Sequence, residues 1–382
     1  MKKLILAFLL FLLYEFNFSN DYNSMYSLNN RRIDTSKISE QYDGPYVDYK
    51  GDKVTVKYIV PEKNGTKIIK ADSVTLSQKN SLSLKVMTDV ADETFLVHLK
   101  KELQNESSEF PNVNKLLVLS DIEGNFGAFR KLLQANKVID EKFKWKFDNG
   151  HLVLIGDFFD RGKQVTEVLW LIYSLEEKAR DEGGYVHFIL GNHEIMNLSN
   201  DLRFVPHKYI DNSSLLNKKY VSLYDENSEL GRWLRTKNIV EKIGDNLFAH
   251  GGISGEINKL NMTVSNINQM SRPYYADSTF NYTDKKLDTI FGDLGPFWYR
   301  GYYTNVNKAT PNQIDSTLSQ FKVKHIVTGH SIVADTVSVW YNGKVLNTDT
   351  HHAAGKSEAL LIEKDKYYRV NAEGKKVLLF QR

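Results

Sequence analysis

Hydrophobic and polar positions follow two different rhythms along this chain. Between residues 42 and 104, apolar side chains such as Val54, Val56 and Val60 alternate with mostly polar ones. A period of two is typical of strands that bury one face. We therefore expect a small β module here, with a turn at residues 61–65 between two of its strands.

From residue 112 onward, short and continuous apolar runs replace this alternation. The runs are Leu116–Leu119, Leu152–Ile155, Phe188–Leu190, Leu247–Ala249 and Ile326–Val327. Runs of this kind predict strands that are buried on both faces. After the first run, Phe126, Phe129 and Leu133 recur at helical spacing, and a similar pattern follows the second run. Strands that alternate with helices indicate an α/β fold, in which ligands bind beyond the carboxyl ends of the strands.

Two long stretches, residues 195–240 and 255–320, separate the third, fourth and fifth runs. They lack a clear period and are rich in aromatic residues. We interpret them as irregular insertions around the mouth of a site, where the choice of substrate would be encoded.

Composition narrows the functional classes. The 382 residues are 41% hydrophobic and 25% charged, which excludes a disordered or fibrous protein. The chain has no cysteine, which excludes disulfides, thiolate zinc sites and a cysteine nucleophile. Its 50 Lys and Arg against 47 Asp and Glu give a net charge of +3, too small for a nucleic-acid-binding surface. No nucleic-acid partner is expected.

The N-terminal segment has the pattern of an export signal. Two lysines precede an apolar run from Leu4 to Tyr14, which is typical of a secretory signal peptide and shorter than the about 20 apolar residues that cross a bilayer. We expect residues 1–20 to be a signal peptide and 21–41 a linker. The mature protein would then be exported, periplasmic or secreted, without a transmembrane span. A buried N-terminal helix and an uncleaved membrane anchor remain the alternatives.

Five polar clusters follow the five apolar runs in order. They are residues 120–125 (Ser-Asp-Ile-Glu-Gly-Asn), 156–162 (Gly-Asp-Phe-Phe-Asp-Arg-Gly), 191–194 (Gly-Asn-His-Glu), 250–252 (His-Gly-Gly) and 329–331 (Gly-His-Ser). Any one of them alone is consistent with a turn or a helix cap. Together, five clusters of carboxylate, amide and imidazole side chains at the ends of predicted strands indicate a metal-dependent active site.

In this order the clusters resemble the calcineurin-like metallophosphoesterases, and especially their phosphoprotein-phosphatase-like branch. Gly-Asp-x-x-Asp-Arg-Gly and Gly-Asn-His-Glu carry most of the resemblance, which extends over residues 116–331. It implies an α/β metallophosphoesterase β-sandwich flanked by helices (αββα) over residues 112–365. The small N-terminal β module, residues 42–104, lies outside the resemblance, and residues 366–382 are expected to form a strand-like C-terminal tail.

The resemblance also implies a metal centre. In this family, two divalent or trivalent ions about 3.5–4 Å apart clamp the phosphate and activate a water for in-line attack. The implied ligands are Asp157, which would bridge both ions; Asn192, His250 and His330 at one ion; and Asp121 with Glu123 at the other.

Glu123 departs from the family pattern, which has a histidine at this position. A carboxylate there gives one ion an all-oxygen shell, which suits Mn²⁺, Mg²⁺ or iron, whereas imidazoles also suit Zn²⁺. We therefore expect Mn²⁺ or iron, with Zn²⁺ as an alternative at the histidine-containing site. The other interpretation is that Glu123 turns away and that this ion binds weakly.

The catalytic and substrate-binding roles also follow from the resemblance. His193 would be the general acid, and Asp160 would orient it. Arg161 and Arg300 would clamp the phosphate, because guanidinium forks match phosphate oxygens. Glu194 is interpreted as a structural residue that fixes its loop.

Residues 349–352 (Asp-Thr-His-His) follow the apolar Val345–Leu346 and could reach the rim of the site. Adjacent histidines on a loop are more often solvated than ligating, so we place this segment outside the metal set.

The leading functional hypothesis is a metal-dependent phosphoric ester hydrolase, a phosphomonoesterase similar to serine/threonine protein phosphatases. Its substrate would be a phosphorylated small molecule, nucleotide or phosphoprotein. The alternatives are a nucleotide or dinucleotide polyphosphate hydrolase, a phosphodiesterase, and a catalytically inactive binding protein that keeps the fold.

Overall fold

The computed structural model describes residues 41–91 and 93–381. The predicted signal peptide and nearly all of the predicted linker lie outside the described residues, so both stay predictions. Within the described part of the chain, no helix combines the length and the apolar character needed to span a membrane.

Two six-stranded sheets form the centre of the molecule. The first has the order β17 (Lys376–Gln381), β16 (Lys366–Asn371), β15 (Glu358–Glu363), β7 (Lys115–Leu119), β8 (His151–Ile155) and β9 (Tyr185–Ile189). The second has the order β13 (Ser338–Trp340), β14 (Val345–Asn347), β12 (His325–Thr328), β11 (Asn246–Ala249), β10 (Val240–Ile243) and β6 (Glu109–Phe110). The segment predicted as a strand-like tail therefore supplies two strands of the first sheet.

Strands β7, β8 and β9 run parallel, as do β11, β12 and β14. In β7, Leu116 and Val118 face the buried layer between the two sheets. Leu117 and Leu119 belong to the core on the opposite face of the same sheet. Burial on both faces explains why the last four residues of this strand are continuously apolar.

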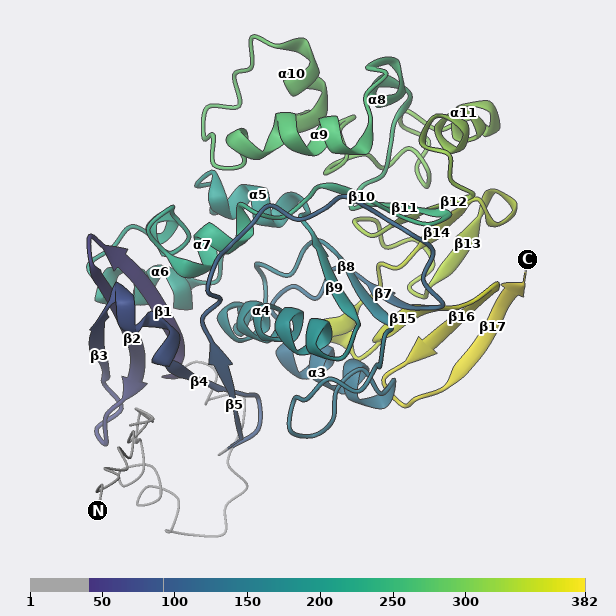
Figure 1. Ribbon diagram of the computed structural model, residues 1–382. Helices are drawn as coiled ribbons and strands as arrows, with labels where there is room; N and C mark the ends of the chain where they lie inside the picture. Colours follow the sequence, from purple (N-terminus) through teal and green to yellow (C-terminus); the bar gives the residue numbers. More distant parts are fainter. Residues whose placement is uncertain (1–40, 92, 382) are drawn as a thin grey trace, which may run out of the picture.

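Helices cover the outer face of each sheet. Helices α3 (Phe126–Ala135) and α4 (Val165–Asp181) pack on the first sheet, and α11 (Pro311–Phe321) lies over the second. Figure 1 shows the resulting layers of helix, sheet, sheet and helix. The predicted helix-flanked β-sandwich is thus confirmed.

The two aromatic-rich insertions are more regular than the sequence suggested. They contain α5 (Asn192–Leu198), α6 (His207–Leu215), α7 (Glu229–Leu234), α8 (Gly255–Lys259), α9 (Val264–Ser271) and α10 (Lys285–Phe291). Short 3₁₀ turns complete the described structure: η1 (Leu76–Ser81), η2 (Tyr220–Leu223), η3 (Arg272–Tyr274), η4 (Tyr341–Gly343) and η5 (His352–Ala354). Several helices begin at a capping hydroxyl: Ser228 accepts from Gly231 N–H and Ser254 from Ile257 N–H. Each of these six helices spans nine residues or fewer, which is too short for a clear period to show in the sequence.

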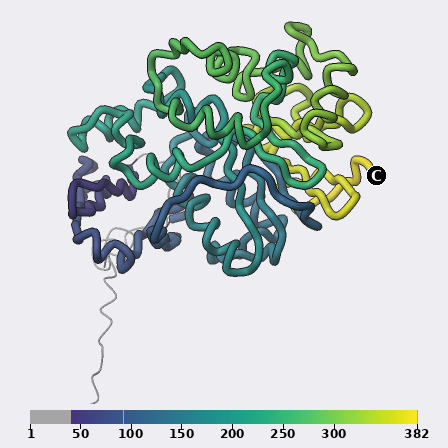
Figure 2. Tube along the Cα trace, turned by 45° about the horizontal axis from the view of Figure 1, so that its top comes forward, coloured from purple at the N-terminus to yellow at the C-terminus, as the bar shows by residue number. Residues whose placement is uncertain are grey.

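The N-terminal part folds as β1 (Asp43–Lys50), β2 (Lys53–Pro61) and β3 (Lys67–Thr75) in one antiparallel sheet, with β4 (Ser83–Met87) and β5 (Thr94–His98) in a hairpin. It is anchored on helices of the main body. Trp170 of α4 donates from Nε1 to the Pro45 carbonyl at 2.9 Å, and Asn212 of α6 donates to Asp43 Oδ2 at 2.6 Å. Figures 1 and 2 show this module at the end of the molecule opposite the C-terminus.

Candidate active site

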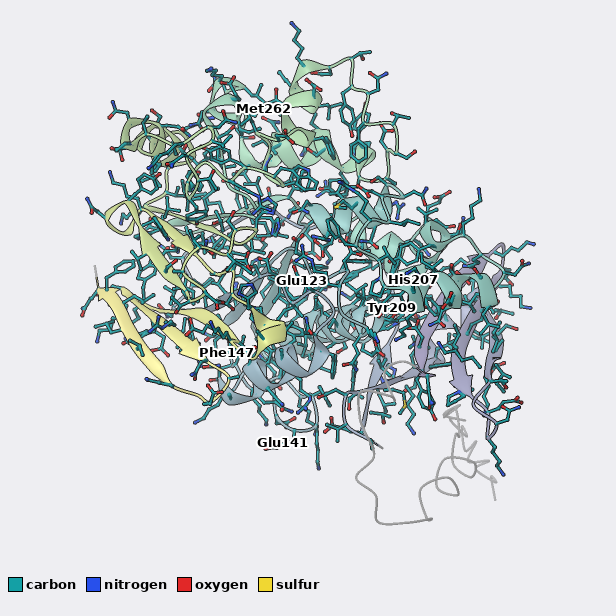
Figure 3. All side chains as sticks on the ribbon, turned by 180° about the vertical axis from the view of Figure 1, so that it is seen from behind. Glu123, Glu141, Phe147, His207, Tyr209 and Met262 are labelled. Carbon is teal, nitrogen blue, oxygen red and sulfur yellow. The ribbon has the colours of Figure 1, made fainter. Side chains whose placement is uncertain are left out.

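The predicted site residues meet where the parallel strands end. Asp121 and Glu123 follow β7; Asp157, Asp160 and Arg161 follow β8; Asn192 and His193 begin α5 after β9; His250 follows β11; His330 follows β12; and Arg300 comes from the segment between α10 and α11. The labelled Glu123 lies near the centre of the molecule in Figure 3, below the helices of the second insertion. The convergence follows from the topology, because parallel strands present their carboxyl ends at one edge.

Tight backbone turns aim these side chains inward. Asp121, Asp157 and His330 have φ values of 54°, 61° and 67°, in the left-handed region that non-glycine residues rarely adopt. The neighbouring glycines are required by contact. A Cβ on Gly156 would lie 2.5 Å from the Cα of Gly191, and one on Gly191 would lie 2.4 Å from Asp157 Oδ1. The glycines of both motifs therefore let the ends of β8 and β9 touch.

Asp157, His250 and His330 form the candidate metal centre. Each offers a ligand atom within 4.8 Å of the others, and all three are buried. His250 donates from Nδ1 to the Ile155 carbonyl at 2.7 Å, which directs Nε2 toward Asp157 Oδ2, 3.0 Å away. His330 donates from Nε2 to the Trp298 carbonyl at 3.2 Å, which leaves Nδ1 available. Backbone carbonyls thus fix which imidazole nitrogen can bind a metal.

Two further predicted ligands border this centre. Asn192 Oδ1 lies 3.1 Å from His250 Nε2. Asp121 Oδ2 accepts the backbone N–H of His330 at 3.0 Å, which joins the ends of β7 and β12. The structure therefore brings five of the six predicted metal ligands to one place.

The electrostatics of the centre favour a cation. Burial and the nearby Asp157 raise the pKa of Asp121 to about 6. Burial lowers the pKa of His250, but Asp157 and Asp121 outweigh it and raise that pKa to about 10. The carboxylates thus stabilise a positive charge at the position of His250 Nε2. A set of buried carboxylates and imidazoles that stabilises positive charge in this way fits divalent metal ions.

Asp349 is a site residue that the sequence-based interpretation left out. It follows β14 and is buried, and its Oδ1 has no hydrogen-bond partner among the described residues. Burial and the nearby Asp121 raise its pKa. The signal was present in the sequence, since Asp349 follows an apolar run as the other five clusters do. His351, by contrast, is exposed and pairs with Asp335.

His193 is held in a fixed orientation beside the metal centre. Its Nδ1 lies 2.5 Å from Asp160 Oδ2, and Asn197 donates to Asp160 Oδ1 at 2.9 Å. Its Nε2 lies 3.7 Å from Asp157 Oδ2, so this nitrogen faces the centre. Burial opposes the charged form, but Asp157 and Asp160 together raise the pKa of His193. This arrangement suits a proton donor.

The two predicted phosphate clamps lie at the opening of the site. Arg161 Nη2 lies 3.5 Å from His193 Nε2, and half of the Arg161 side chain is exposed. Arg300 donates from Nη1 to the His330 carbonyl and, at 3.0 Å, to Ser331 Oγ. Both guanidinium groups are therefore anchored next to the residues that border the metal centre.

Glu123 is held differently from the other predicted ligands. Its carboxylate forms an ion pair with Arg161 Nη1. Its assignment as a metal ligand stays a prediction, and so does the alternative that it turns away. Glu194 is confirmed as a structural group: its buried carboxylate accepts the backbone N–H groups of Asp157, Phe158 and Gly191 at 2.7–2.8 Å.

Comparison with known proteins identifies the class. Residues 114–334 match the family described as calcineurin-like phosphoesterases. This match covers more than half of the chain, so the protein belongs to that family and is a hydrolase of phosphoester bonds. Its family implies divalent metal ions and phosphorylated substrates.

More particular similarities lie within the phosphoprotein-phosphatase-like branch. The chain is 35% identical to the cold-active protein-tyrosine phosphatase of a psychrophilic Shewanella species, covering 89% of this chain and 99% of that one, with a TM-score of 0.79. It is 27% identical over 251 residues to Shewanella-like protein phosphatase 1 of Plasmodium berghei, covering 62% of this chain and 67% of that protein. A serine/threonine phosphatase structure from Saccharomyces cerevisiae, 17% identical with a TM-score of 0.50 and coverage of 69% and 78%, shares the fold.

Proposed function

We propose that the protein is a metal-dependent phosphomonoesterase that removes phosphate from proteins, with phosphotyrosine among its substrates. One observation carries this proposal. The oriented pair of His193 and Asp160 faces the group formed by Asp157, His250 and His330, whose ligand atoms lie within 4.8 Å of one another. A proton donor beside a candidate metal centre is what phosphate ester hydrolysis requires.

Asp157, His250 and His330 would hold one ion with Asn192 beside them, and Asp121 with Asp157 would hold the second. When bound, such ions clamp the phosphate and activate a water for in-line attack. The proposed protein ligands of the second ion are all oxygen atoms, so Mn²⁺ or iron is proposed there. At the first ion, the imidazole nitrogens also accept Zn²⁺.

The other side chains act on the substrate directly. His193 donates a proton from Nε2 to the oxygen that leaves with the alcohol or phenol, and Asp160 keeps the imidazole oriented and charged. Arg161 and Arg300 bind the non-bridging phosphate oxygens. Two guanidinium groups at the opening suit a terminal phosphate with its two negative charges better than a diester with one.

The substrate class is supported by the relatives. The Shewanella protein that is 35% identical is described as a protein-tyrosine phosphatase, and the Plasmodium berghei relative is named a protein phosphatase. Tyrosine phosphate therefore joins the serine and threonine phosphates that the sequence suggested.

The proposal is tested with the full chain after removal of bound metal. Hydrolysis of p-nitrophenyl phosphate and bis-p-nitrophenyl phosphate is measured with Mn²⁺, Fe²⁺, Zn²⁺ or Mg²⁺ added. We expect monoester turnover that Mn²⁺ or Fe²⁺ restores. His193→Ala should lower kcat by about 10²–10⁴-fold, while His98→Ala, an exposed histidine of β5, should not change it. Faster diester turnover, or none with any metal, would contradict the proposal.

A further inference from the structure

Phe204 is an exposed aromatic side chain at the opening of the active site. It lies between α5 and α6, and 42% of its surface is accessible to solvent. Its ring centroid is 5.1 Å from that of His193, with an angle of 56° between the ring planes. The guanidinium carbon of Arg161 lies 5.4 Å from the same centroid. The ring therefore borders both the general acid and one phosphate clamp.

The backbone holds Phe204 in this place. Its carbonyl accepts the N–H of Arg161 at 3.1 Å, which ties the loop to the end of β8. The next residue back, Arg203, places its guanidinium 5.8 Å from the Phe204 ring and pairs with Asp201 at 2.6 Å. The hydrogen bond from Arg161 thus holds Phe204 at the end of β8, although the ring itself is open to solvent.

The proposed reaction places one part of the substrate, the leaving group, beside the Phe204 ring. His193 protonates the leaving oxygen, so the organic group attached to that oxygen must lie next to His193. Because the Phe204 ring centroid lies 5.1 Å from that of His193, this group would also lie beside Phe204. Aromatic rings prefer centroid separations of about 4.5–7 Å in offset or tilted pairs, and a phenolic leaving group beside His193 falls within that range of Phe204.

We propose that Phe204 is a specificity-determining residue that contacts the leaving group and favours aryl over alkyl phosphate monoesters. The inference rests on the proposed function and deepens it. A tyrosyl ring at this position packs against Phe204, whereas a seryl side chain is too short to do so. The preference for phosphotyrosine is then set by this ring and not by the phosphate clamps, which contact every monoester in the same way.

The experiment compares two peptides of identical sequence that differ in one residue, phosphotyrosine or phosphoserine. The value of kcat/KM is measured for both with the metal-loaded full-length enzyme, as wild type, Phe204→Leu and Phe204→Trp. Aryl esters are intrinsically more reactive than alkyl esters, but this difference cancels when the ratio of the two values is compared between variants. Phe280→Leu is the matched control, because Phe280 is 43% exposed and lies in the segment before α10.

We expect Phe204→Leu to lower the tyrosine-to-serine ratio about fivefold, mainly by raising KM for the phosphotyrosine peptide. Phe204→Trp should keep the ratio within about twofold of wild type, because an aromatic face is retained. Phe280→Leu should leave the ratio unchanged.

Two results would overturn the inference without affecting the proposed function. In the first, Phe204→Leu slows both peptides by the same factor, which would make Phe204 a packing residue for His193 and Arg161. In the second, the substitution changes kcat/KM for neither peptide. A wild-type enzyme that hydrolyses neither peptide nor p-nitrophenyl phosphate would overturn the proposed function and this inference together.

Discussion

Two buried clusters of charged groups show opposite ways of satisfying charge inside this molecule. The first, which we call the Lys237 cluster, consists of Lys100, Glu106, Glu176 and Lys237. Lys237 Nζ lies 2.7 Å from a Glu106 oxygen and 2.6 Å from a Glu176 oxygen, and Lys100 also pairs with Glu176. Two ammonium groups face two carboxylates, so the cluster is neutral within itself.

The active site is the second cluster, and not all of its carboxylate oxygens have a partner among the described residues. Asp121, Asp157 and Asp349 are all buried, and Asp349 Oδ1 has no partner within the described part of the chain. Burying a carboxylate without a partner is costly, so such a set persists where a cation completes it. The comparison teaches that burial of charge alone does not mark an active site. A buried carboxylate oxygen without a partner among the described residues, beside ligand atoms that face one another, does.

The largest predicted effect concerns the stability of the neutral cluster. Lys237→Met removes a buried ammonium and leaves Glu106 without its closest cation, which should lower the free energy of unfolding by about 3–5 kcal/mol. Urea denaturation measures this change. The matched control is Lys259→Met, because Lys259 forms an ion pair with Glu256 while its side chain is 71% exposed; it should cost at most about 1 kcal/mol. Equal effects of the two substitutions would remove the distinction between the clusters.

The pH dependence of the same cluster gives a second prediction. Burial raises the pKa of Glu106, but Lys237 and a hydrogen bond from Tyr185 outweigh it and lower that pKa from 4.5 to about 2. A lowered pKa contributes stability that is complete above pH 4.5 and is lost as pH falls toward the folded-state pKa. The free energy of unfolding of the wild type should therefore exceed that of Glu106→Gln by about 3 kcal/mol at neutral pH. This difference should disappear between pH 4.5 and 2. A gap that stays constant down to pH 3 would contradict the assignment.

Metal-linked stability tests the active-site cluster. Mn²⁺ at about 100 times its Kd should raise the free energy of unfolding by about 2.7 kcal/mol, because it binds the folded state alone. Asp157→Asn should lose most of this increase, since the substitution removes a ligand oxygen between the two proposed ions. Asp72→Asn, at an exposed position in β3, should keep it. Denaturation with and without Mn²⁺ gives the answer without any assay of activity.

The sequence is informative about this fold where local pattern and burial agree. Strand β7 is apolar from Leu116 to Leu119 because its successive side chains face different cores, and this makes the strand visible as a run. The polar clusters that follow such strands mark the site because the strand ends converge. Asp349 also follows an apolar strand. The sequence did not place it in the site, because the two histidines after it indicate a solvated loop.

Long-range pairing is what the sequence does not reveal. Lys237 is separated from Glu176 by 61 positions and from Glu106 by 131, and no local period connects them. The short helices of the insertions depend on caps such as Ser228 and on tertiary packing. The spacing of their apolar residues therefore does little to predict them. The ion pair between Glu123 and Arg161 belongs to the same class, because each residue sits in a different motif.

Glu123 therefore offers the finest test of how far a motif predicts a role. Family resemblance makes it a metal ligand, whereas its position in the structure makes it a competitor with phosphate for Arg161. Glu123→Gln separates the two roles through binding of Mn²⁺ and of inorganic phosphate, measured independently by calorimetry. If the carboxylate serves Arg161, the substitution frees Nη1 and should tighten phosphate binding by about two- to fivefold, the scale of a partly exposed ion pair.

Under that role, affinity for Mn²⁺ should change by less than about threefold, as expected for the loss of a charge outside the shell. A ligand role predicts the reverse: affinity for Mn²⁺ should fall by at least about 10-fold, because losing a ligand costs more than losing a group that only hydrogen-bonds to one. Glu141→Gln, on the exposed turn labelled at the edge of Figure 3, is the control for loss of one negative charge. The two roles predict opposite responses in the two titrations. The single substitution therefore decides whether Glu123 is a metal ligand or a group that competes with phosphate for Arg161.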